Sequence, residues 1–453
     1  MKNLLKTIVF LLFAIGVFTA FKKGQPAADS ILFRHVTLID GNGKSPVANT
    51  DILIQGETIA DIGKNLQAPG ARIIDLKGKT VMPSLICAHM HIGLLKGTAN
   101  NAENYTRDNI LSQLNKYESY GVGNVLVMGT DRPILFESGL RDSSENGLLP
   151  GARLHSAGYG FGVPENAPPI EVGTDKVFRP QSKENVPLEM DTNAKLHPTI
   201  IKMWVDDFAG KYKKMDPSIY KSIITEAHKR NIRVASHLFY LADARKLVAS
   251  GLDVIAHSIR DSVVDDALVQ EMKKRNVMYI PTLSLDEFSY IYARKPEWIN
   301  DEFFKRSLEP GVYEMITSEK YQNDLKNSPQ YARNVKSFET ALKNLQKIYA
   351  AGILVALGTD SGATPIRTQG FSEHLELELM VQAGLTPLQA ITVATKNAAK
   401  LLKIDDHFGT LQKGKTADFI ILSADPTKDI KNSRRIESVY KSGKEVSHGP
   451  LNN

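Results

Sequence analysis

After about residue 30, the chain shows short apolar runs separated by glycine and other turn-forming residues. These runs lie at 31–40, 51–55, 56–62 and 71–76. Short runs that are rich in β-branched residues and bounded by turn signals are typical of β-strands. We therefore expect residues 29–80 to form a small β-sheet domain.

From residue 81 the pattern changes to short apolar runs that alternate with longer amphipathic segments. Such alternation is typical of β–α units around a parallel sheet. The apolar runs predict strands at 83–91, 124–128, 153–157, 199–205, 233–237, 254–257, 277–281 and 353–360. The amphipathic segments predict helices at 109–120, 217–231, 242–250, 265–275, 371–383 and 387–402. Eight β–α steps predict an α/β fold, a (β/α)₈ TIM barrel, over residues 81–405.

Two further segments accompany this predicted barrel. Residues 284–337 are charged and aromatic, and we expect them to form helical excursions over one strand end, as a candidate lid. Beyond residue 405 the strand pattern returns at 418–422 and 436–440. We expect residues 406–453 to complete the sheet begun at 29–80, which gives a small composite β-sandwich domain built from both ends of the chain.

Residues 1–20 have the pattern of a secretory signal peptide. Two lysines precede an uncharged apolar run at 7–18, which is too short to span a bilayer comfortably. We expect cleavage after Ala20 or Ala28 and export to the periplasm or the cell exterior, without stable membrane insertion of the mature chain. An uncleaved N-terminal anchor is the alternative.

The overall composition is that of a soluble globular protein. Of the 453 residues, 42% are hydrophobic and 23% are charged, which is ordinary for that class. The net charge of +6 is modest and the lysines are scattered, so we expect no nucleic-acid binding. Cys87 is the single cysteine, so the chain forms no internal disulfide. We expect Cys87 to be a small buried residue rather than a nucleophile.

Polar residues gather at the predicted carboxyl ends of the barrel strands, where active sites of TIM barrels lie. His89 and His91 are two residues apart on a strand, so both side chains can point to one metal ion. The full set comes from predicted strands one, four, five, six and eight and consists of His89, His91, Lys202, His237, His257 and Asp360.

Each of these residues also has an ordinary structural interpretation. A single histidine such as His237 or His257 is more often a hydrogen-bonded core residue, and Asp360 could be a helix N-cap. Lys202 is unusual, because lysine within an apolar run avoids burial unless it is paired or modified. The joint occurrence of all six residues, in register with the eight strands, indicates a metal centre.

The segments that contain these six residues resemble the amidohydrolase superfamily of metal-dependent hydrolases, nearest to its imidazolonepropionase-like and Xaa-Pro dipeptidase (prolidase) branches. The resemblance covers about residues 31–445 and is carried by 81–91, 199–203, 235–237, 254–257, 358–362, 383–390 and 409–422. The chain departs from the family pattern at Ser84, where glycine is usual, and at Cys87, where an acidic or amide residue is common.

The resemblance implies a role for each residue of the set. His89 and His91 would bind the more buried ion, and Lys202, carboxylated on its amine, would bridge two ions. His237 and His257 would bind the second ion.

By the same resemblance, Asp360 would be both a metal ligand and the catalytic proton carrier. The cofactor would be a divalent metal, with Zn²⁺ as the default for histidine-rich ligation. Two ions per chain are expected if Lys202 is carboxylated. Otherwise one ion would bind His89, His91, His237 and Asp360.

The substrate-facing residues are less clear from sequence. Tyr159, Tyr240 and Arg367 follow strands three, five and eight and could each orient a carbonyl or carboxylate, although each is also a common loop residue. His374 is expected to pack rather than to act.

The resemblance implies a metal-dependent hydrolase that cleaves an amide-type C–N bond of a small molecule, such as a dipeptide or an N-acyl amino acid. The alternatives are a mononuclear cyclic amide or imine hydrolase, a promiscuous esterase or phosphotriesterase, and a non-catalytic ligand-binding barrel. The partner is a small-molecule substrate, and a homo-oligomer is left open.

Overall fold

The computed structural model describes residues 30–164, 168 and 176–452. The predicted signal peptide at 1–20 lies outside these residues, so export stays a prediction. Within the described ranges, no helix is long and apolar enough to cross a membrane.

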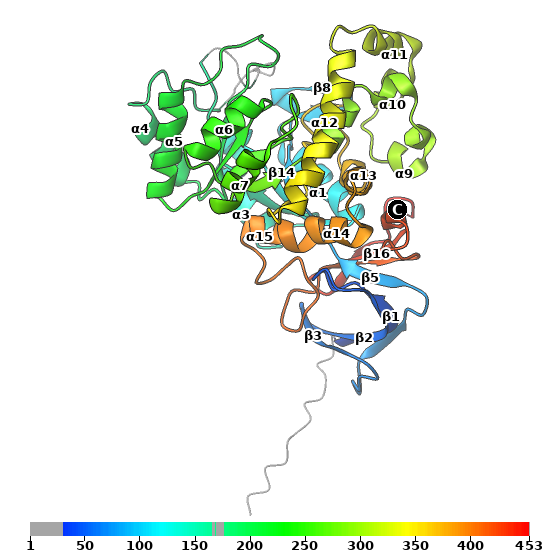
Figure 1. Cartoon of the computed structure of the whole chain (residues 1–453). Helices are drawn as coiled ribbons and strands as arrows, with labels where there is room; N and C mark the ends of the chain where they lie inside the picture. The colour runs from blue at the N-terminus through cyan, green and yellow to red at the C-terminus, as the bar shows by residue number, and fades with distance from the viewer. Residues whose placement is uncertain (1–29, 165–167, 169–175, 453) are drawn as a thin grey trace, which may run out of the picture.

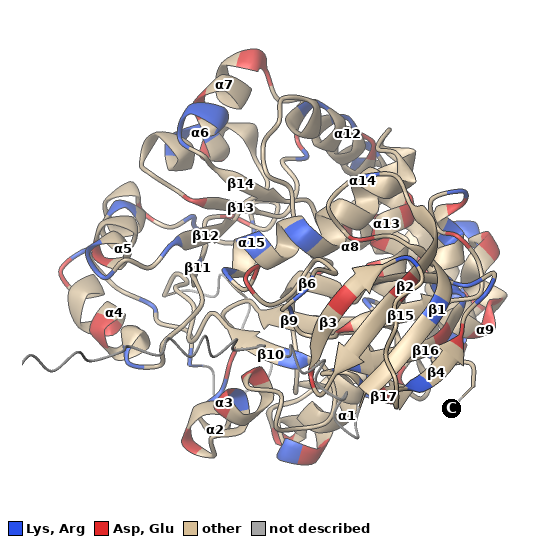
Figure 2. Cartoon of the chain, turned by 90° about the horizontal axis from the view of Figure 1, so that it is seen from below, with Lys and Arg blue, Asp and Glu red and all other residues tan. Residues whose placement is uncertain are grey.

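The centre of the molecule is a barrel of short parallel strands. Two arcs of strands form it, β6–β9–β10 and β11–β12–β13–β14, and Figure 2 shows both arcs with helices on the outside. The strands are β6 Leu85–Met90, β9 Val122–Val127, β10 Arg153–Ser156, β11 Ile201–Trp204, β12 Val234–His237, β13 Val254–Ala256 and β14 Met278–Ile280. All but Met278 of their residues are buried, as expected for a parallel sheet covered on its outer face.

Residues 353–360 take the place of the eighth strand without forming a regular one. Backbone hydrogen bonds join this segment to β14 on one side and to β6 on the other, and a further bond joins β10 to the start of β11. The amide of Tyr279 donates to the carbonyl oxygen of Leu354 at 3.0 Å, and the amide of Ala88 donates to that of Leu357 at 2.7 Å. The amide of Thr199 donates to the carbonyl oxygen of Ser156 at 2.8 Å. The predicted (β/α)₈ barrel is therefore confirmed.

Amphipathic helices cover the outer face of the barrel (Figure 1). In α5, for example, Ile219, Ile223 and Ala227 recur every four residues and all three are buried. The helices are α1 Arg107–Ser119, α2 Pro133–Glu137, α3 Leu140–Glu145, α4 Val186–Ala194, α5 Pro217–Lys229, α6 Leu241–Ala249, α7 Asp266–Lys274, α12 Tyr331–Ala350, α13 Phe371–Gln382, α14 Pro387–Thr392 and α15 Ala398–Leu402.

The segment predicted as a lid forms a packed wall. It contains α8 Leu283–Phe288, α9 Glu302–Lys305, α10 Val312–Thr317 and α11 Glu319–Lys326. The ring of Trp298 lies 4.7 Å from that of Phe304 and 5.1 Å from that of Phe371 on α13. These aromatic contacts hold the excursion against the barrel, and Leu285 on α8 reaches the cavity described below.

Strands from both chain ends form one small domain, as predicted. The sheet order is β17–β16–β15–β5–β1–β2–β3, with β4 beside β1. The strands are β1 Ser30–Leu38, β2 Val47–Gln55, β3 Thr58–Gly63, β4 Arg72–Asp75, β5 Thr80–Pro83, β15 Phe419–Leu422, β16 Ile436–Lys441 and β17 Lys444–Ser447. In Figure 1 this sheet curves strongly below the barrel, with the blue and red ends of the chain side by side.

The two chain ends meet at β5, which pairs parallel with β1 and antiparallel with β15. The chain thus leaves the small sheet at Pro83 and enters β6 two residues later. The rings of Phe33, Phe419 and Tyr440 form the core of this domain, with centroids 4.7–5.4 Å apart. A buried ion pair between Arg153 and Asp418 joins the domain to the barrel.

His374 on α13 packs in the core, as expected. Its Nε2 donates to the carbonyl oxygen of Tyr120 at 2.9 Å, and its Nδ1 accepts from the hydroxyl of Ser433 at 3.0 Å. Both bonds suit a neutral ring. Burial lowers the pKa of His374 to about 3.

This buried histidine predicts a pH dependence of stability. The unfolded chain binds a proton at a pKa of 6.5, but folded His374 does not until about pH 3. Stability is therefore lost as the pH falls below 6.5. Relative to a His374→Gln variant, the wild type should lose about 2 kcal/mol between pH 7 and pH 5. Urea denaturation at several pH values measures this difference. The exposed-site control His407→Gln should track the wild type, and equal slopes for all three proteins would contradict the assignment.

Candidate metal centre

A cavity of about 420 Å³ opens at the carboxyl ends of the barrel strands. His91, His237, His257 and Asp360, four of the six predicted ligand residues, line it. The other two, His89 and Lys202, lie fully buried beneath it. The structure therefore brings the set together, although its members are up to 271 residues apart, from 89 to 360, in sequence.

The tightest group in this set is His89, His91 and Asp360. Asp360 Oδ1 lies 3.2 Å from His89 Nε2 and 2.9 Å from His91 Nε2. One potential ligand atom from each residue lies within 4.8 Å of the others, which is the spacing of a site for one cation.

Asp360 adopts a left-handed backbone conformation, with φ of +57°. Aspartate tolerates this region better than most residues. Its amide donates to the carbonyl oxygen of His89 at 2.9 Å, and its carboxylate forms an ion pair with Arg367. Burial opposes ionisation, but Arg367 and the two neighbouring histidines hold the pKa of Asp360 well below its usual range.

Three histidines have one ring nitrogen held by a neighbouring side chain. His91 Nδ1 lies 2.7 Å from Thr130 Oγ1, and His257 Nδ1 lies 2.9 Å from Thr282 Oγ1. The ring centroid of His257 is 4.4 Å from those of both His89 and His237. Such contacts fix the ring orientation and tautomer that a metal ligand needs.

His237 is oriented by a residue that the sequence reasoning missed. Its Nε2 lies 2.9 Å from Asp206 Oδ2, and Phe208 stacks on its ring at 5.3 Å. Burial raises the pKa of Asp206, but the hydrogen bond and charge of His237, the charge of Arg260 and the amide of Phe208 together outweigh burial and lower this pKa to about 2. Its position in the sequence could have indicated this role, because Asp206 directly follows the fourth predicted strand.

Lys202 is a fully buried lysine at the base of the site. Its Nζ lies 3.3 Å from His89 Nε2 and 5.2 Å from the centre of the Trp204 ring. Burial lowers the pKa of Lys202 to about 7. Gly129, at φ of +81°, leaves room for its stem, since a Cβ atom there would lie 2.8 Å from Lys202 Cβ.

Helix α13 supports both sides of the site, which the sequence did not predict. Glu373 Oε1 accepts from Thr359 Oγ1 at 2.7 Å and from Ser361 Oγ at 2.9 Å, so it clamps both neighbours of Asp360. One turn on, Glu376 accepts from the amides of Leu283 and Ser284 at 2.8 and 2.7 Å. That contact fixes the start of α8.

Cys87 and Ser84 are the two departures from the family pattern. The Cys87 thiol is buried and lies 3.5 Å from Thr359 Oγ1, and burial raises its pKa well above the usual value. This environment favours a packing role. The Ser84 hydroxyl is buried without a hydrogen-bond partner among the described residues.

Of the three predicted substrate-binding residues, Arg367 lines the cavity and the two tyrosines do not. Tyr159 packs between the rings of Phe136 and Phe178, at 5.6 and 5.9 Å. The Tyr240 hydroxyl donates to Asp207 at 2.9 Å. Both tyrosines are therefore occupied by protein contacts in this structure.

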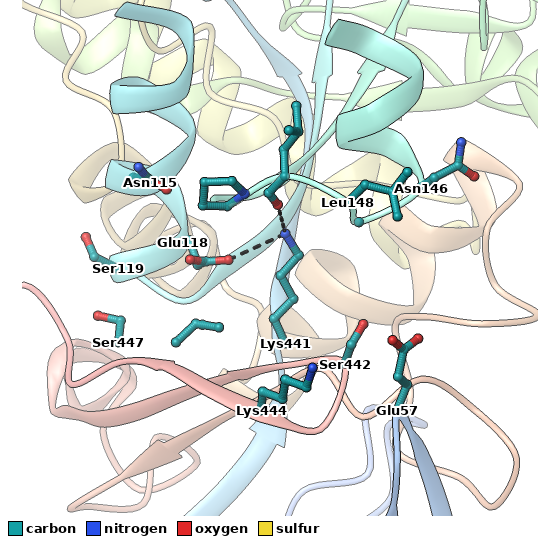
Figure 3. A pocket seen from close by; sticks show the side chains of 14 residues that line it. Glu57, Asn115, Glu118, Ser119, Asn146, Leu148, Lys441, Ser442, Lys444 and Ser447 are labelled. Carbon is teal, nitrogen blue, oxygen red and sulfur yellow. Dashed lines mark hydrogen bonds and ion pairs between the residues drawn. The ribbon is translucent and has the colours of Figure 1, made fainter. Parts of the chain in front are cut away.

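A larger cavity, of about 690 Å³, lies at the opposite end of the barrel (Figure 3). It is bounded by α1 and by the β16–β17 hairpin, and no histidine lines it within the described residues. Lys441 donates to the carbonyl oxygen of Leu149 at 2.7 Å and lies 3.8 Å from Glu118. These contacts join the small domain to the barrel, and the chemistry-bearing residues lie elsewhere.

Two relatives of known sequence match most of the chain. A 5-methylthioadenosine/S-adenosylhomocysteine deaminase of Pyrococcus furiosus is 25% identical over 407 residues, which cover 83% of each chain. An imidazolonepropionase of Flavobacterium psychrophilum is 24% identical over 407 residues, which cover 85% of this chain and 89% of the relative.

Among solved structures, a Xaa-Pro dipeptidase with bound methionine has a TM-score of 0.72 at 22% identity, covering 92% of this chain and 99% of that one. A molinate hydrolase has a TM-score of 0.71 at 20% identity, covering 92% and 94%. At these identities the likeness establishes the fold. The family model for amidohydrolases matches residues 80–446. The chain therefore belongs to the amidohydrolase family of hydrolases, which act on carbon–nitrogen bonds.

Proposed function

We propose that this protein is a metal-dependent hydrolase that cleaves the amide bond of a small molecule such as a dipeptide or an N-acyl amino acid. One observation carries the proposal: the convergence of His89, His91 and Asp360 within 4.8 Å beside a cavity. Imidazole nitrogens and a carboxylate oxygen are ligands that Zn²⁺ and similar divalent cations take.

The donor set fits a metal in a second respect. His91 Nδ1, His257 Nδ1 and His237 Nε2 are held by Thr130, Thr282 and Asp206. The other nitrogens of His237 and His257 have no hydrogen bond within the described part of the chain, so they are available as ligands.

We further propose that Lys202 is carboxylated and that the site holds two ions. A lysine with a pKa near 7 is about half neutral amine at neutral pH. Its Nζ lone pair can form a bond to the carbon of CO₂ with loss of one proton, giving an anionic carbamate. That anion, with His237 and His257, would hold a second ion where an ammonium group would repel it.

The chain's own residues would then perform the hydrolysis. When bound, a divalent cation lowers the pKa of a water molecule towards neutrality and polarises the substrate carbonyl. Asp360 accepts the proton of the attacking water on its carboxylate and donates it to the leaving nitrogen. Arg367 keeps Asp360 ionised until that step. Trp204 and Phe208 line the cavity and give it two aromatic walls.

A mononuclear hydrolase of cyclic amides or imines is the second candidate. It is favoured by the cluster of His89, His91 and Asp360, which could hold one ion without Lys202. The imidazolonepropionase relative supports the same candidate.

Metal analysis and a substrate screen test the proposal together. We expect two divalent ions per chain, and hydrolysis of at least one Xaa-Pro dipeptide, other dipeptide or N-acyl amino acid by the metal-loaded protein. One ion per chain with hydrolysis of a cyclic amide would favour the second candidate. Protein that binds no ion, and that hydrolyses nothing after metal addition, would refute both.

A further inference from the structure

We propose that Arg260 binds a carboxylate of the substrate, so that the enzyme selects amides that carry a free carboxylate. This inference rests on the proposed amide hydrolysis and narrows its substrate class. It separates this chain from hydrolases of neutral amides, whose substrates have no anionic group to place beside a buried cation in the cavity wall.

Arg260 belongs to the wall of the same cavity. It follows β13 at three residues beyond His257, and its side chain lines the cavity although it is only 7% exposed. The guanidinium carbon lies 4.9 Å from the centre of the Phe239 ring, so the group rests on an aromatic platform. Its plane is thereby fixed, which lowers the entropy lost when a ligand binds.

The contacts of Arg260 leave one edge of the guanidinium open. Nε lies 3.1 Å from Asp286 Oδ1 on α8, and Nη1 donates to the carbonyl oxygen of Ser258 at 3.4 Å. Nη2 has no protein partner among the described residues. Asp286 itself does not line the cavity. Asp286 therefore holds Nε from outside the cavity wall, which leaves Nη2 without a competing acceptor within the ranges that the structure describes.

The charges around the cavity favour an anion at this point. The lining carboxylates Asp206 and Asp360 are already engaged, by His237 and by Arg367 respectively. The charge of Arg260 also lowers the pKa of Asp206, but the ion-pair partner of Arg260, Asp286, lies outside the cavity wall. A planar guanidinium with open N–H groups binds a carboxylate through two parallel hydrogen bonds, and water exclusion strengthens them.

The test compares an acid with its carboxamide. The best dipeptide or N-acyl amino acid from the screen is measured beside the same compound with its carboxylate converted to a carboxamide. We expect wild-type kcat/KM to favour the acid by at least about tenfold, since a hydrogen bond to a charged group contributes roughly that factor or more. Arg260→Met should raise KM for the acid about 10- to 100-fold with a smaller change in kcat. The kcat/KM for the carboxamide should stay unchanged.

Two further variants keep this test interpretable. Arg333→Met is the matched control, because Arg333 also packs on the Phe239 ring, at 4.4 Å, without lining the cavity. It should behave like the wild type. If Arg260→Met folds poorly because Asp286 is left unpaired, the double variant Arg260→Met with Asp286→Asn removes that buried charge.

Two distinct failures can be told apart. Equal kcat/KM for acid and carboxamide, or an unchanged KM in Arg260→Met, would overturn the role of Arg260 and leave the hydrolase intact. If the metal-loaded wild type hydrolyses neither compound, the proposed function fails. In that case, calorimetry with a panel of N-acetyl amino acids and their carboxamides tests whether Arg260 binds a carboxylate. Binding of the acids that is lost in Arg260→Met would support it, and binding of neither series, or of both equally, would overturn it.

Discussion

Replacing Asp360 with asparagine is expected to lower kcat by about 10²- to 10⁴-fold, the range for loss of a positioned proton carrier. Asparagine keeps the shape of the side chain and an oxygen near His89 and His91, but it cannot accept the proton of the attacking water. KM should change less than kcat, because the groups that line the rest of the cavity are untouched. Steady-state kinetics at saturating metal, with the ion content measured in the same samples, separates lost proton transfer from lost metal.

Asp243→Asn provides the control for this substitution. Asp243 is also a largely buried aspartate, but it pairs with Lys214 at 2.6 Å on the outside of the barrel. Its replacement should leave kcat within about twofold of the wild type, because Asp243 does not line the cavity. An Asp360→Asn enzyme that retained more than a tenth of wild-type kcat would show that another group carries the proton.

Replacing Lys202 with methionine is expected to remove one of two bound ions and to lower kcat by about 10²-fold or more, since Lewis-acid stabilisation is worth several kcal/mol. Methionine fills a similar volume in the buried site without a group that CO₂ can modify. In the wild type, removal of CO₂ and bicarbonate during metal reconstitution should lower the ion content from two to one. In Lys202→Met the same treatment should change nothing.

The comparison needs a lysine that is not at the site. Lys214→Met serves, because Lys214 is a half-buried surface residue with pairing partners on other elements. It should retain the wild-type ion content and its dependence on CO₂. Wild-type ion content and rate in Lys202→Met would refute a bridging lysine and leave the one-ion site.

The barrel could be predicted from sequence because its strands are buried on both faces and read as continuous apolar runs. The alternation of strand and helix segments then indicated the number of β–α units. The irregularity of residues 353–360 could not be foreseen. Gly358 brings this segment against its neighbours, since a Cβ atom there would lie 2.4 Å from Ile280 Cγ2 and 2.7 Å from His89 Cβ. Such close approach depends on packing rather than on the local pattern.

The predicted ligand set came together because its residues lie at strand ends, which the barrel places around one axis. The residues that support the ligand set could not be predicted in the same way. Asp286, Glu373 and Glu376 lie on helices whose positions depend on tertiary packing, so their spacing in the sequence carries no signal. Loop residues were the least predictable, as Tyr240 turns to Asp207 on a neighbouring loop instead of the cavity.

The composite sheet has a consequence for the order of folding. The pairing of β5 with β15 joins residues 80–83 to residues 419–422, one of the most distant contacts in the chain. Contacts of such sequence separation form slowly, because the intervening loop must first be ordered. During synthesis from the N-terminus, one edge of β5 stays unpaired until the whole barrel has been made. The N-terminal strands alone are therefore an incomplete domain with an exposed strand edge, which is a recognised route to aggregation. A truncation anywhere before residue 419 would make that state permanent.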